Sequence, residues 1–206
     1  MDKYVNISKR LSAYLLDIFL IYFLLTLISN IRFINPSYNN LMETSNEYTD
    51  TLEKYESKEI SEEELLTLNK DYVYKITKYS ISTNIACILV IFAYFGLFQK
   101  YNNGQTLGKK IMKIKVVGDN QETVSIGKYF LRILPMYYIF IGSVLPLAIS
   151  SLIVNFVGAT NFSLINSIII YIFFGIGITS FVMMNIRKDK KGLHDLISGT
   201  KVIFEK

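Results

Sequence analysis

The stretch KRLSAYLLDIFLIYFLLTLIS (residues 9–29) decides the fold class of this chain. Its apolar part is long enough to cross a membrane, because an α-helix needs roughly 20 residues to span about 30 Å of hydrocarbon. It also exceeds the roughly 7–15 residues of a signal-peptide core, so we expect a retained membrane anchor. Arg10 precedes the apolar run and Asp17 interrupts it. The position of this acidic residue requires an explanation.

Apolar blocks of this kind lie at residues 11–31, 79–98, 129–153 and 162–186 of the 206-residue chain. Each block reaches the length of a membrane-spanning helix. The sequence therefore predicts an all-α membrane protein, a four-transmembrane-helix bundle. We expect it to carry an extracellular helical hairpin and a small cytoplasmic cap of short helices plus a β-hairpin.

The distribution of charge predicts the orientation in the membrane. Basic residues outnumber acidic ones in segments 1–10, 100–128 and 187–206, and acidic residues outnumber basic ones in segment 32–78. By the positive-inside rule, both termini and the middle loop are cytoplasmic and residues 32–78 are extracellular. The net charge of +5 is then a signal of topology in a multi-pass cell-membrane protein. We expect no nucleic-acid partner, which would need a contiguous basic surface.

The acidic segment 32–78 predicts an outward-facing helical hairpin. Leu, Ile and Tyr residues recur there at helical spacing, at Leu41, Tyr48, Leu52 and Tyr55 and at Leu65, Leu68, Tyr72, Ile76 and Tyr79. Ser61 and Glu64 have capping-box spacing, so the second helix is expected to begin there after a turn at residues 57–61. The apolar stripe is either the seam of the hairpin or a surface that docks a partner.

The cytoplasmic cap is expected to combine segments 99–128 and 187–206. In GQTLGKKIMKIKVV (residues 104–117) apolar and lysine side chains fall on different helical faces, which suits a short helix on the anionic cytoplasmic leaflet. Residues 113–117 and 122–126 read as two strands around a turn. The β-prone tail, residues 200–204, is a further partner for the first of these strands.

Together these motifs resemble the RDD family of bacterial integral membrane proteins, named for one arginine and two aspartates. By this resemblance, residues 1–206 form one RDD-type membrane domain, with segment 32–78 as an insertion. The resemblance makes Arg10 the family arginine, Asp17 the first aspartate and Asp195, in KKGLHDLISGT (residues 190–200), the second. Its other motif positions are Gly104, Thr106, Gly108, Lys109, Gly192 and His194. It implies transport of a small ligand, or cation/proton exchange as attributed to some members.

Asp17 lies about six residues into its apolar run, roughly 9 Å deep at 1.5 Å per residue, where an unpaired charge is costly. Arg10, two helical turns earlier, and Arg132, at the start of the third block, are the expected partners, and Lys109 and His194 are weaker ones. One interpretation is a buried ionic pair that fixes helix packing. The other is a ligand, ion or proton site in which Asp17 binds a monovalent cation or proton.

Other classes of function find less support in the sequence. His194 beside Asp195 is accompanied by no nucleophile or phosphate-binding loop, so we expect no enzyme. One cysteine, Cys87, and one histidine predict neither a disulfide nor a metal site, and no cofactor. An accessory or scaffold protein, which binds a membrane partner or a second copy of itself through the hairpin or the cap, is the alternative to transport.

Overall fold

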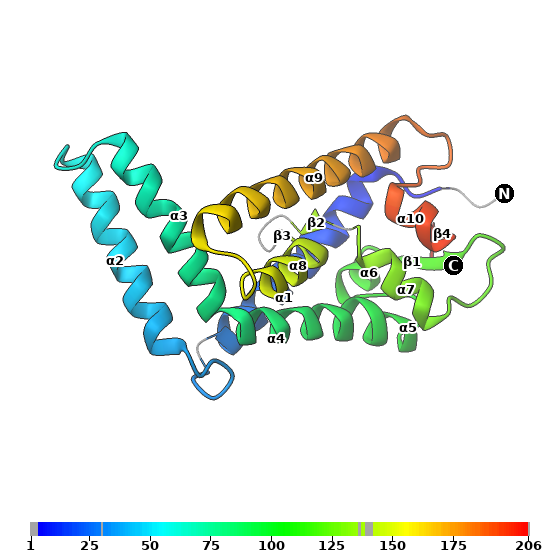
Figure 1. Cartoon of the computed structure of the whole chain (residues 1–206). Helices are drawn as coiled ribbons and strands as arrows, with labels where there is room; N and C mark the ends of the chain where they lie inside the picture. The colour runs from blue at the N-terminus through cyan, green and yellow to red at the C-terminus, as the bar shows by residue number, and fades with distance from the viewer. Residues whose placement is uncertain (1–3, 30, 136, 139–141, 206) are drawn as a thin grey trace. The chain divides into compact units, whose positions relative to one another are not determined.

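The computed structural model of the chain describes residues 4–29, 31–135, 137–138 and 142–205. The chain divides into two compact units. Unit 1 comprises Met1–Thr26, Cys87–Leu145 and Ile172–Lys206. Unit 2 comprises Leu27–Ala86 and Pro146–Tyr171. Most of the described chain is helical (Figure 1).

In the described part of the chain, 3 helical segments are long and apolar enough to cross a membrane. The first lies in α1 (Ile7–Ser29) and the last is α9 (Ala159–Ile186). Between them, Ile81–Tyr101 is a continuous segment. It is built from α4 (Ile81–Phe92), the π-helical η1 (Ala93–Phe98) and α5 (Gln99–Tyr101). These segments indicate a membrane location.

The expected span at residues 129–153 is not one helix. Its place is taken by α7 (Ile126–Ile133), a short pairing of β2 (Tyr137–Tyr138) with β3 (Gly142–Ser143), and α8 (Val144–Ile153). The 10 residues of α8 are about half the length that a membrane crossing needs. Pro135 lies just after α7, and proline has no N–H to continue a helix and disfavours helical geometry in the residue before it.

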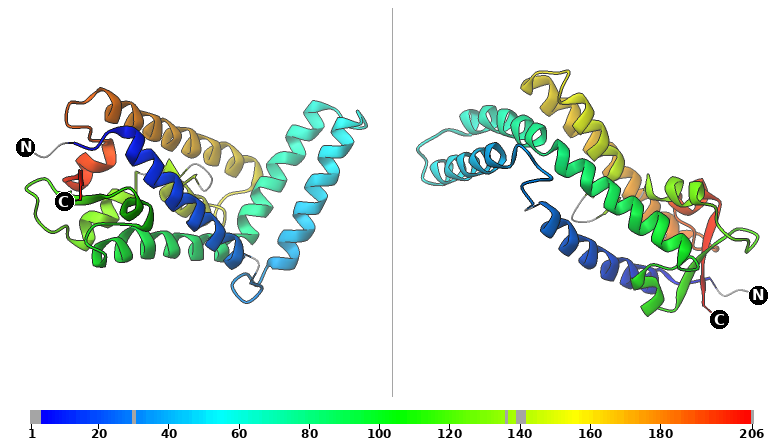
Figure 2. Two further views of the ribbon diagram at one scale, coloured as in Figure 1. Left: turned by 180° about the vertical axis from the view of Figure 1, so that it is seen from behind. Right: turned by 90° about the horizontal axis from the view of Figure 1, so that it is seen from below.

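Unit 2 contains the predicted hairpin, formed by α2 (Tyr38–Glu56) and α3 (Glu62–Tyr79). The two helices run side by side (Figure 2). In their seam the rings of Tyr48 and Tyr72 lie 5.3 Å apart, and the hydroxyls of Tyr72 and Thr51 are hydrogen-bonded at 3.0 Å. The predicted seam is therefore partly right, since Tyr55 is exposed and buried threonines take part.

The ends of α3 also agree with the sequence. The hydroxyl of Ser61 accepts a hydrogen bond from the backbone N–H of Glu64 at 3.2 Å, which caps the helix. At the other end, only Ser80 separates α3 from α4. The second arm of the hairpin thus continues almost directly into an apolar helix.

In unit 1, a two-stranded antiparallel sheet joins β1 (Ile114–Gly118) to β4 (Thr200–Phe204). Ile114 pairs with Phe204 and Gly118 with Thr200. This confirms the predicted pairing of the tail. The β-hairpin predicted for residues 113–126 is wrong, because 122–126 contains no strand. The backbone N–H of Val116 donates instead to the carbonyl of Gly104 at 2.9 Å, which occupies the second edge of β1.

Three short helices surround this sheet: α6 (Leu107–Ile111), α7 and α10 (Leu193–Ser198). Of these, α6 packs against β1, α10 packs against β4, and α7 packs against α10 (Figure 1). Two apolar clusters fill unit 1. One centres on Ile18, Ile21, Ile91, Phe95 and Ile133, and the other on Val5, Ala13, Ile114, Val116 and Val202. Because α1 contributes to both, Asp17 lies where the two clusters meet.

Candidate functional site

The carboxylate of Asp17 is fully buried, at 0% exposure, and is surrounded by donors. Its Oδ1 accepts hydrogen bonds from the hydroxyl of Tyr94 at 2.7 Å and from the backbone N–H of Gly108 at 2.8 Å. Its Oδ2 accepts from the hydroxyl of Thr106 at 2.5 Å. Asp17 therefore fastens α1 to α6 and to η1.

Glycine is required at two positions of this contact. A side chain at Gly108 would collide with the carbonyl oxygen of Ala13 and lie 2.9 Å from the Cγ of Asp17. Gly104 has a φ of +82°, and a side chain there would meet the carbonyl oxygen of Val116. Positive φ and close backbone approach both select glycine. Gly104 is therefore a turn position and Gly108 a close-approach position.

Lys109 is the basic side chain nearest to Asp17 among the described residues. Its Nζ lies 3.9 Å from Oδ2 of Asp17 and donates to the hydroxyl of Thr106 at 3.2 Å. The side chain is 12% exposed and also lies over the ring of Phe95, 5.7 Å from its centroid. Burial lowers the pKa of Lys109 to about 8, against the opposing effect of Asp17. The lysine can therefore lose its proton near neutral pH.

The second aspartate, Asp195, binds both arginines. Arg132 donates through Nη1 to its Oδ1, and Arg10 donates through Nη2 to its Oδ2 at 2.5 Å. The backbone N–H of Gly192 donates to Oδ2 at 3.0 Å, which caps α10. Burial on its own would raise the pKa of Asp195, but the positive charges around it, Arg132 foremost, hold this pKa well below its usual range. Asp195 is therefore charged at every physiological pH.

Each arginine also makes a second contact in the tail of the chain. Arg10 donates through Nη1 to the carbonyl of Lys190 at 2.5 Å, and Arg132 donates through Nη1 to the hydroxyl of Thr200 at 2.7 Å. The Arg132 side chain is 5% exposed and that of Arg10 is 10% exposed. Residues of α1, α7, α10 and β4 are thus joined in one buried ionic network.

The hydrogen bonds of His194 determine its tautomer. Its Nε2 lies 3.2 Å from Nη2 of Arg10, and arginine can only donate, so Nε2 is the acceptor. Its Nδ1 then carries the proton and donates to the hydroxyl of Ser180 at 3.0 Å. That hydroxyl also accepts from the backbone N–H of Leu193 at 3.0 Å. Burial lowers the pKa of His194 to about 3, so the ring is neutral at pH 7.

The structure therefore divides the predicted site into two. Asp17 is associated with Lys109, which was expected to be a weaker partner, and the expected pairing of Asp17 with Arg10 or Arg132 does not occur. Both arginines bind Asp195. Sequence reasoning missed Tyr94, Ser180 and Thr200 as ligands of these groups. The sequence did contain a signal for Tyr94. Its hydroxyl lies in an otherwise apolar run close to a loop, where it needs a polar partner.

A cavity of about 470 Å³ adjoins both aspartate sites. Arg10, Lys109 and Arg132 line it, together with His194, Ser180 and apolar side chains of α1 and α9. Its volume is typical of small-molecule sites. Among the described residues, no group of three or more His, Cys, Asp and Glu side chains gathers in a form that could hold a metal ion.

Comparison with known proteins identifies the family. The RDD family pattern matches residues 4–199. YxaI of Bacillus subtilis (strain 168), an uncharacterized protein, is 28% identical over 141 residues, which is 66% of this chain and 68% of YxaI. YckC of the same strain, also uncharacterized, is 27% identical over 117 residues, 56% of this chain and 58% of YckC. No solved structure gives a significant match. The match over nearly the whole sequence shows that this chain belongs to the RDD family.

Proposed function

We propose that this RDD protein is a membrane transport protein in which Asp17 and Lys109 form a proton-exchanging pair. The observation that carries the proposal is the position of the Lys109 ammonium. It lies 3.9 Å from the buried Asp17 carboxylate and lines the cavity of unit 1. Ionisable groups buried in membrane proteins are expensive and commonly mark solute or proton pathways.

Charge balance suggests how the pair would work. When Lys109 is protonated, the pair is neutral and the carboxylate of Asp17 needs no further counter-charge. When Lys109 gives up its proton, the carboxylate is left with an unbalanced negative charge in a buried site. A monovalent cation or a proton at Asp17 would restore the balance, and this alternation is the elementary step of cation/proton exchange. The arginines, held by Asp195, take no part in it.

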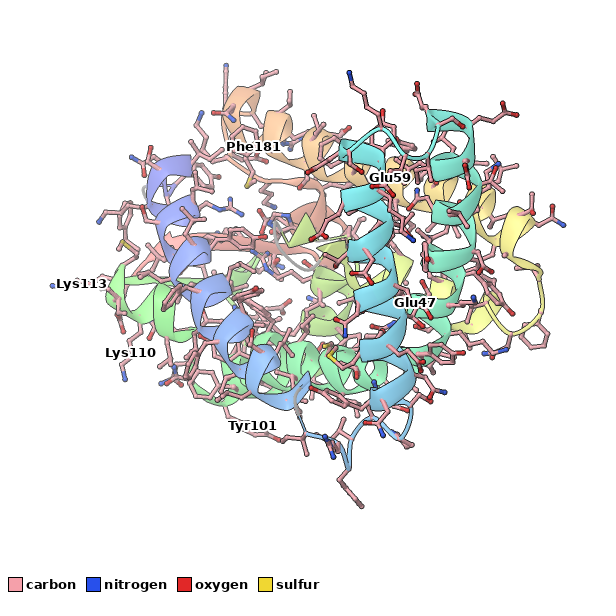
Figure 3. The ribbon with its side chains drawn as sticks, turned by 90° about the vertical axis from the view of Figure 1, so that its left-hand side faces the viewer. Glu47, Glu59, Tyr101, Lys110, Lys113 and Phe181 are labelled. Atoms are coloured by element: carbon pink, nitrogen blue, oxygen red, sulfur yellow. The ribbon has the colours of Figure 1, made fainter. Side chains whose placement is uncertain are left out.

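The proposal is tested in proteoliposomes that hold a pH gradient, at matched and verified levels of reconstituted protein. We expect addition of sodium or potassium to collapse the gradient with the natural protein and not with Asp17→Asn or Lys109→Gln. Lys110→Gln is the matched control, because Lys110 is exposed and extends away from the ribbon (Figure 3). Exchange that survives in both Asp17→Asn and Lys109→Gln would refute the assignment.

The hydrogen bonds of Asp17 favour a second candidate function. Its three hydrogen bonds join α1, η1 and α6. A residue whose role is only to hold these segments together would make such contacts. On this account the protein is an accessory or scaffold protein that binds a membrane partner, or a second copy of itself, through the hairpin or the sheet with its short helices. Deleting residues 39–75 would then disrupt a complex, whereas Asp17→Asn would only lower the melting temperature and leave ion flux at the level of empty vesicles throughout.

We also propose that α6 lies on the cytoplasmic side, against the anionic leaflet. Leu107 and Ile111 are 43% and 64% exposed, and the side chains of Lys110 and Lys113 project outward (Figure 3). Apolar and lysine side chains together suit an anionic membrane surface. The topology is tested in a Cys87→Ala background by labelling single cysteines at position 61 and position 110 with a membrane-impermeant reagent. In intact cells, the reagent should label the cysteine at position 61 and should not label the cysteine at position 110.

Catalysis forms no part of the proposal. His194 and Asp195 are the adjacent acid and base that a hydrolytic function would use. Each already has a set of partners within unit 1, namely Arg10 and Ser180 for His194, and Arg10, Arg132 and Gly192 for Asp195. Both side chains are more than nine-tenths buried. These contacts suit a structural network.

A further inference from the structure

The cavity of unit 1 has two chemically different parts. Five residues of α9 that line it follow helical spacing and are mostly apolar: Phe174, Gly177, Ile178, Phe181 and Met184. The charged part is formed by Arg10, Lys109 and Arg132. These three cations are close together, because both arginines bind Asp195 and both influence the ionisation of Lys109. An apolar stripe thus borders a cluster of positive charge.

No acidic side chain offsets this charge at the cavity surface. Among the described lining residues none is Asp or Glu, and the carboxylates of Asp17 and Asp195 are both 0% exposed behind the cations. The three cations exceed these two buried carboxylates by one positive charge. His194, which also lines the cavity, is neutral at pH 7 because burial lowers its pKa to about 3. While Lys109 is protonated, the cavity surface therefore attracts an anion.

Arg132 has hydrogen-bonding capacity that its protein partners do not use. Both of its hydrogen bonds, to Asp195 and Thr200, leave from Nη1. Nε and Nη2 make no hydrogen bond to any residue in the part of the chain that the structure describes. These two nitrogens form one edge of the planar guanidinium. This edge has the fork geometry that binds a carboxylate or phosphate with two parallel hydrogen bonds.

We propose that this cavity binds an anionic amphiphile, with a carboxylate or phosphate headgroup on the free edge of Arg132 and near Lys109, and an aliphatic tail along the apolar stripe of α9. A buried guanidinium with unpaired donors is costly, and such a headgroup would satisfy them. The apolar stripe gives the tail a surface that a free phosphate ion cannot use. The inference concerns binding alone and holds whether or not the protein transports ions.

The test is ligand-induced stabilisation of the purified full chain in detergent. The probes are oleate and oleoyl lysophosphatidate, which share the tail and differ in headgroup, with oleoyl lysophosphatidylcholine as the zwitterionic control and inorganic phosphate as the soluble anion. We expect a saturable rise in melting temperature with the first two and none with the others. An equal rise with lysophosphatidylcholine, or a full rise with inorganic phosphate alone, would overturn the proposal.

Two pairs of variants locate the binding. Lys109→Gln should raise the half-saturating concentration of oleate about tenfold, because a charge-assisted contact is lost, and Lys110→Gln should leave it unchanged. Ile178→Trp places a large side chain in the cavity, and Val182→Trp is its control on the same helix. These two positions are similarly exposed, at 49% and 43%, but only Ile178 lines the cavity. Loss of binding in both tryptophan variants, or in neither, contradicts the assigned site.

Discussion

The guanidinium of Arg10 donates a 2.5 Å hydrogen bond to the carboxylate of Asp195, so the first helix of the chain is bonded to the last. Arg132 of α7 binds the other oxygen of the same carboxylate. A single fully buried aspartate thus holds three segments that are distant in sequence. Arg10 and Asp195 are direct partners, while Asp17 belongs to a different site.

The first prediction concerns this ion pair. Asp195→Asn leaves Arg10 and Arg132 buried without a counter-charge, and breaking a buried pair typically costs about 3–5 kcal/mol. We expect a large fall in the melting temperature, measured in detergent with a thiol-reactive fluorophore that reports exposure of the single cysteine, Cys87. Asp189→Asn is the control, since Asp189 pairs with Arg187 at the surface and such pairs contribute little. Similar melting temperatures for the two variants would show that the network is not structural.

The second prediction is a pH dependence that belongs to His194. Its pKa is lowered from 6.5 to about 3 by burial, so below pH 6.5 the unfolded chain binds a proton that the folded chain does not. The contribution of His194 to the free energy of unfolding is therefore fully present above pH 6.5 and is lost as the pH falls toward 3. Between pH 6.5 and 4.5 the loss amounts to about 2 kcal/mol.

The comparison that isolates this effect is with His194→Gln. The pKa of Asp195 stays well below its usual range because the charges around it outweigh burial, so its contribution is intact across the same interval. As the pH falls from 6.5 to 4.5, the free energy of unfolding should therefore decrease more for the natural protein than for His194→Gln. Parallel curves would mean that the histidine is protonated in the folded state.

Local patterns in the sequence predicted the hairpin of unit 2 and the strand pairing of the tail. The N-cap at Ser61, the turn after α2 and the β-prone residues 200–204 depend on near neighbours or on simple alternation, and the structure confirms them. The third apolar block, residues 129–153, was predicted to span the membrane only because it is long enough and apolar. The helix that begins this block, α7, ends before Pro135, and α8 is the short apolar helix that follows.

The partners of the two aspartates could not be deduced in this way. Arg10 lies two helical turns from Asp17 and on nearly the same face, which made it the natural partner within α1. The fold instead places the loop with Thr106 and Gly108 against Asp17 and leaves Arg10 for Asp195. This arrangement depends on the close approach of the backbone at Gly108 to the backbone of α1. The presence of a glycine in the sequence does not reveal which segment lies against it.

The third prediction tests the cap of α3. Ser61→Ala removes the hydroxyl that accepts from the N–H of Glu64, and loss of an N-cap typically costs about 1 kcal/mol. We expect faster amide hydrogen exchange in the first turn of α3 and little change in α2. Ser61→Asp should restore protection, because aspartate caps as well as serine. Unaltered exchange in Ser61→Ala would show that the cap does not hold the helix start.

The fourth prediction follows from the contact between α6 and α1. In Gly108→Ala the new methyl group would collide with the carbonyl of Ala13 and press on Asp17. Because backbone atoms cannot move aside as a side chain can, we expect a loss of about 1–3 kcal/mol, as for other overpacked sites. The measurement is again the melting temperature in detergent.

Gly127→Ala is the matched control for that variant. Gly127 lies in α7 with nothing within 4 Å of its added methyl group, and alanine is favoured over glycine in a helix by roughly 0.5–1 kcal/mol. The same substitution should therefore stabilise the protein at Gly127 and destabilise it at Gly108. If Gly108→Ala were tolerated as well as Gly127→Ala, α6 could not lie close enough to α1 for the backbone N–H of residue 108 to donate to Asp17. The site would then lose the hydrogen bond that fixes its geometry.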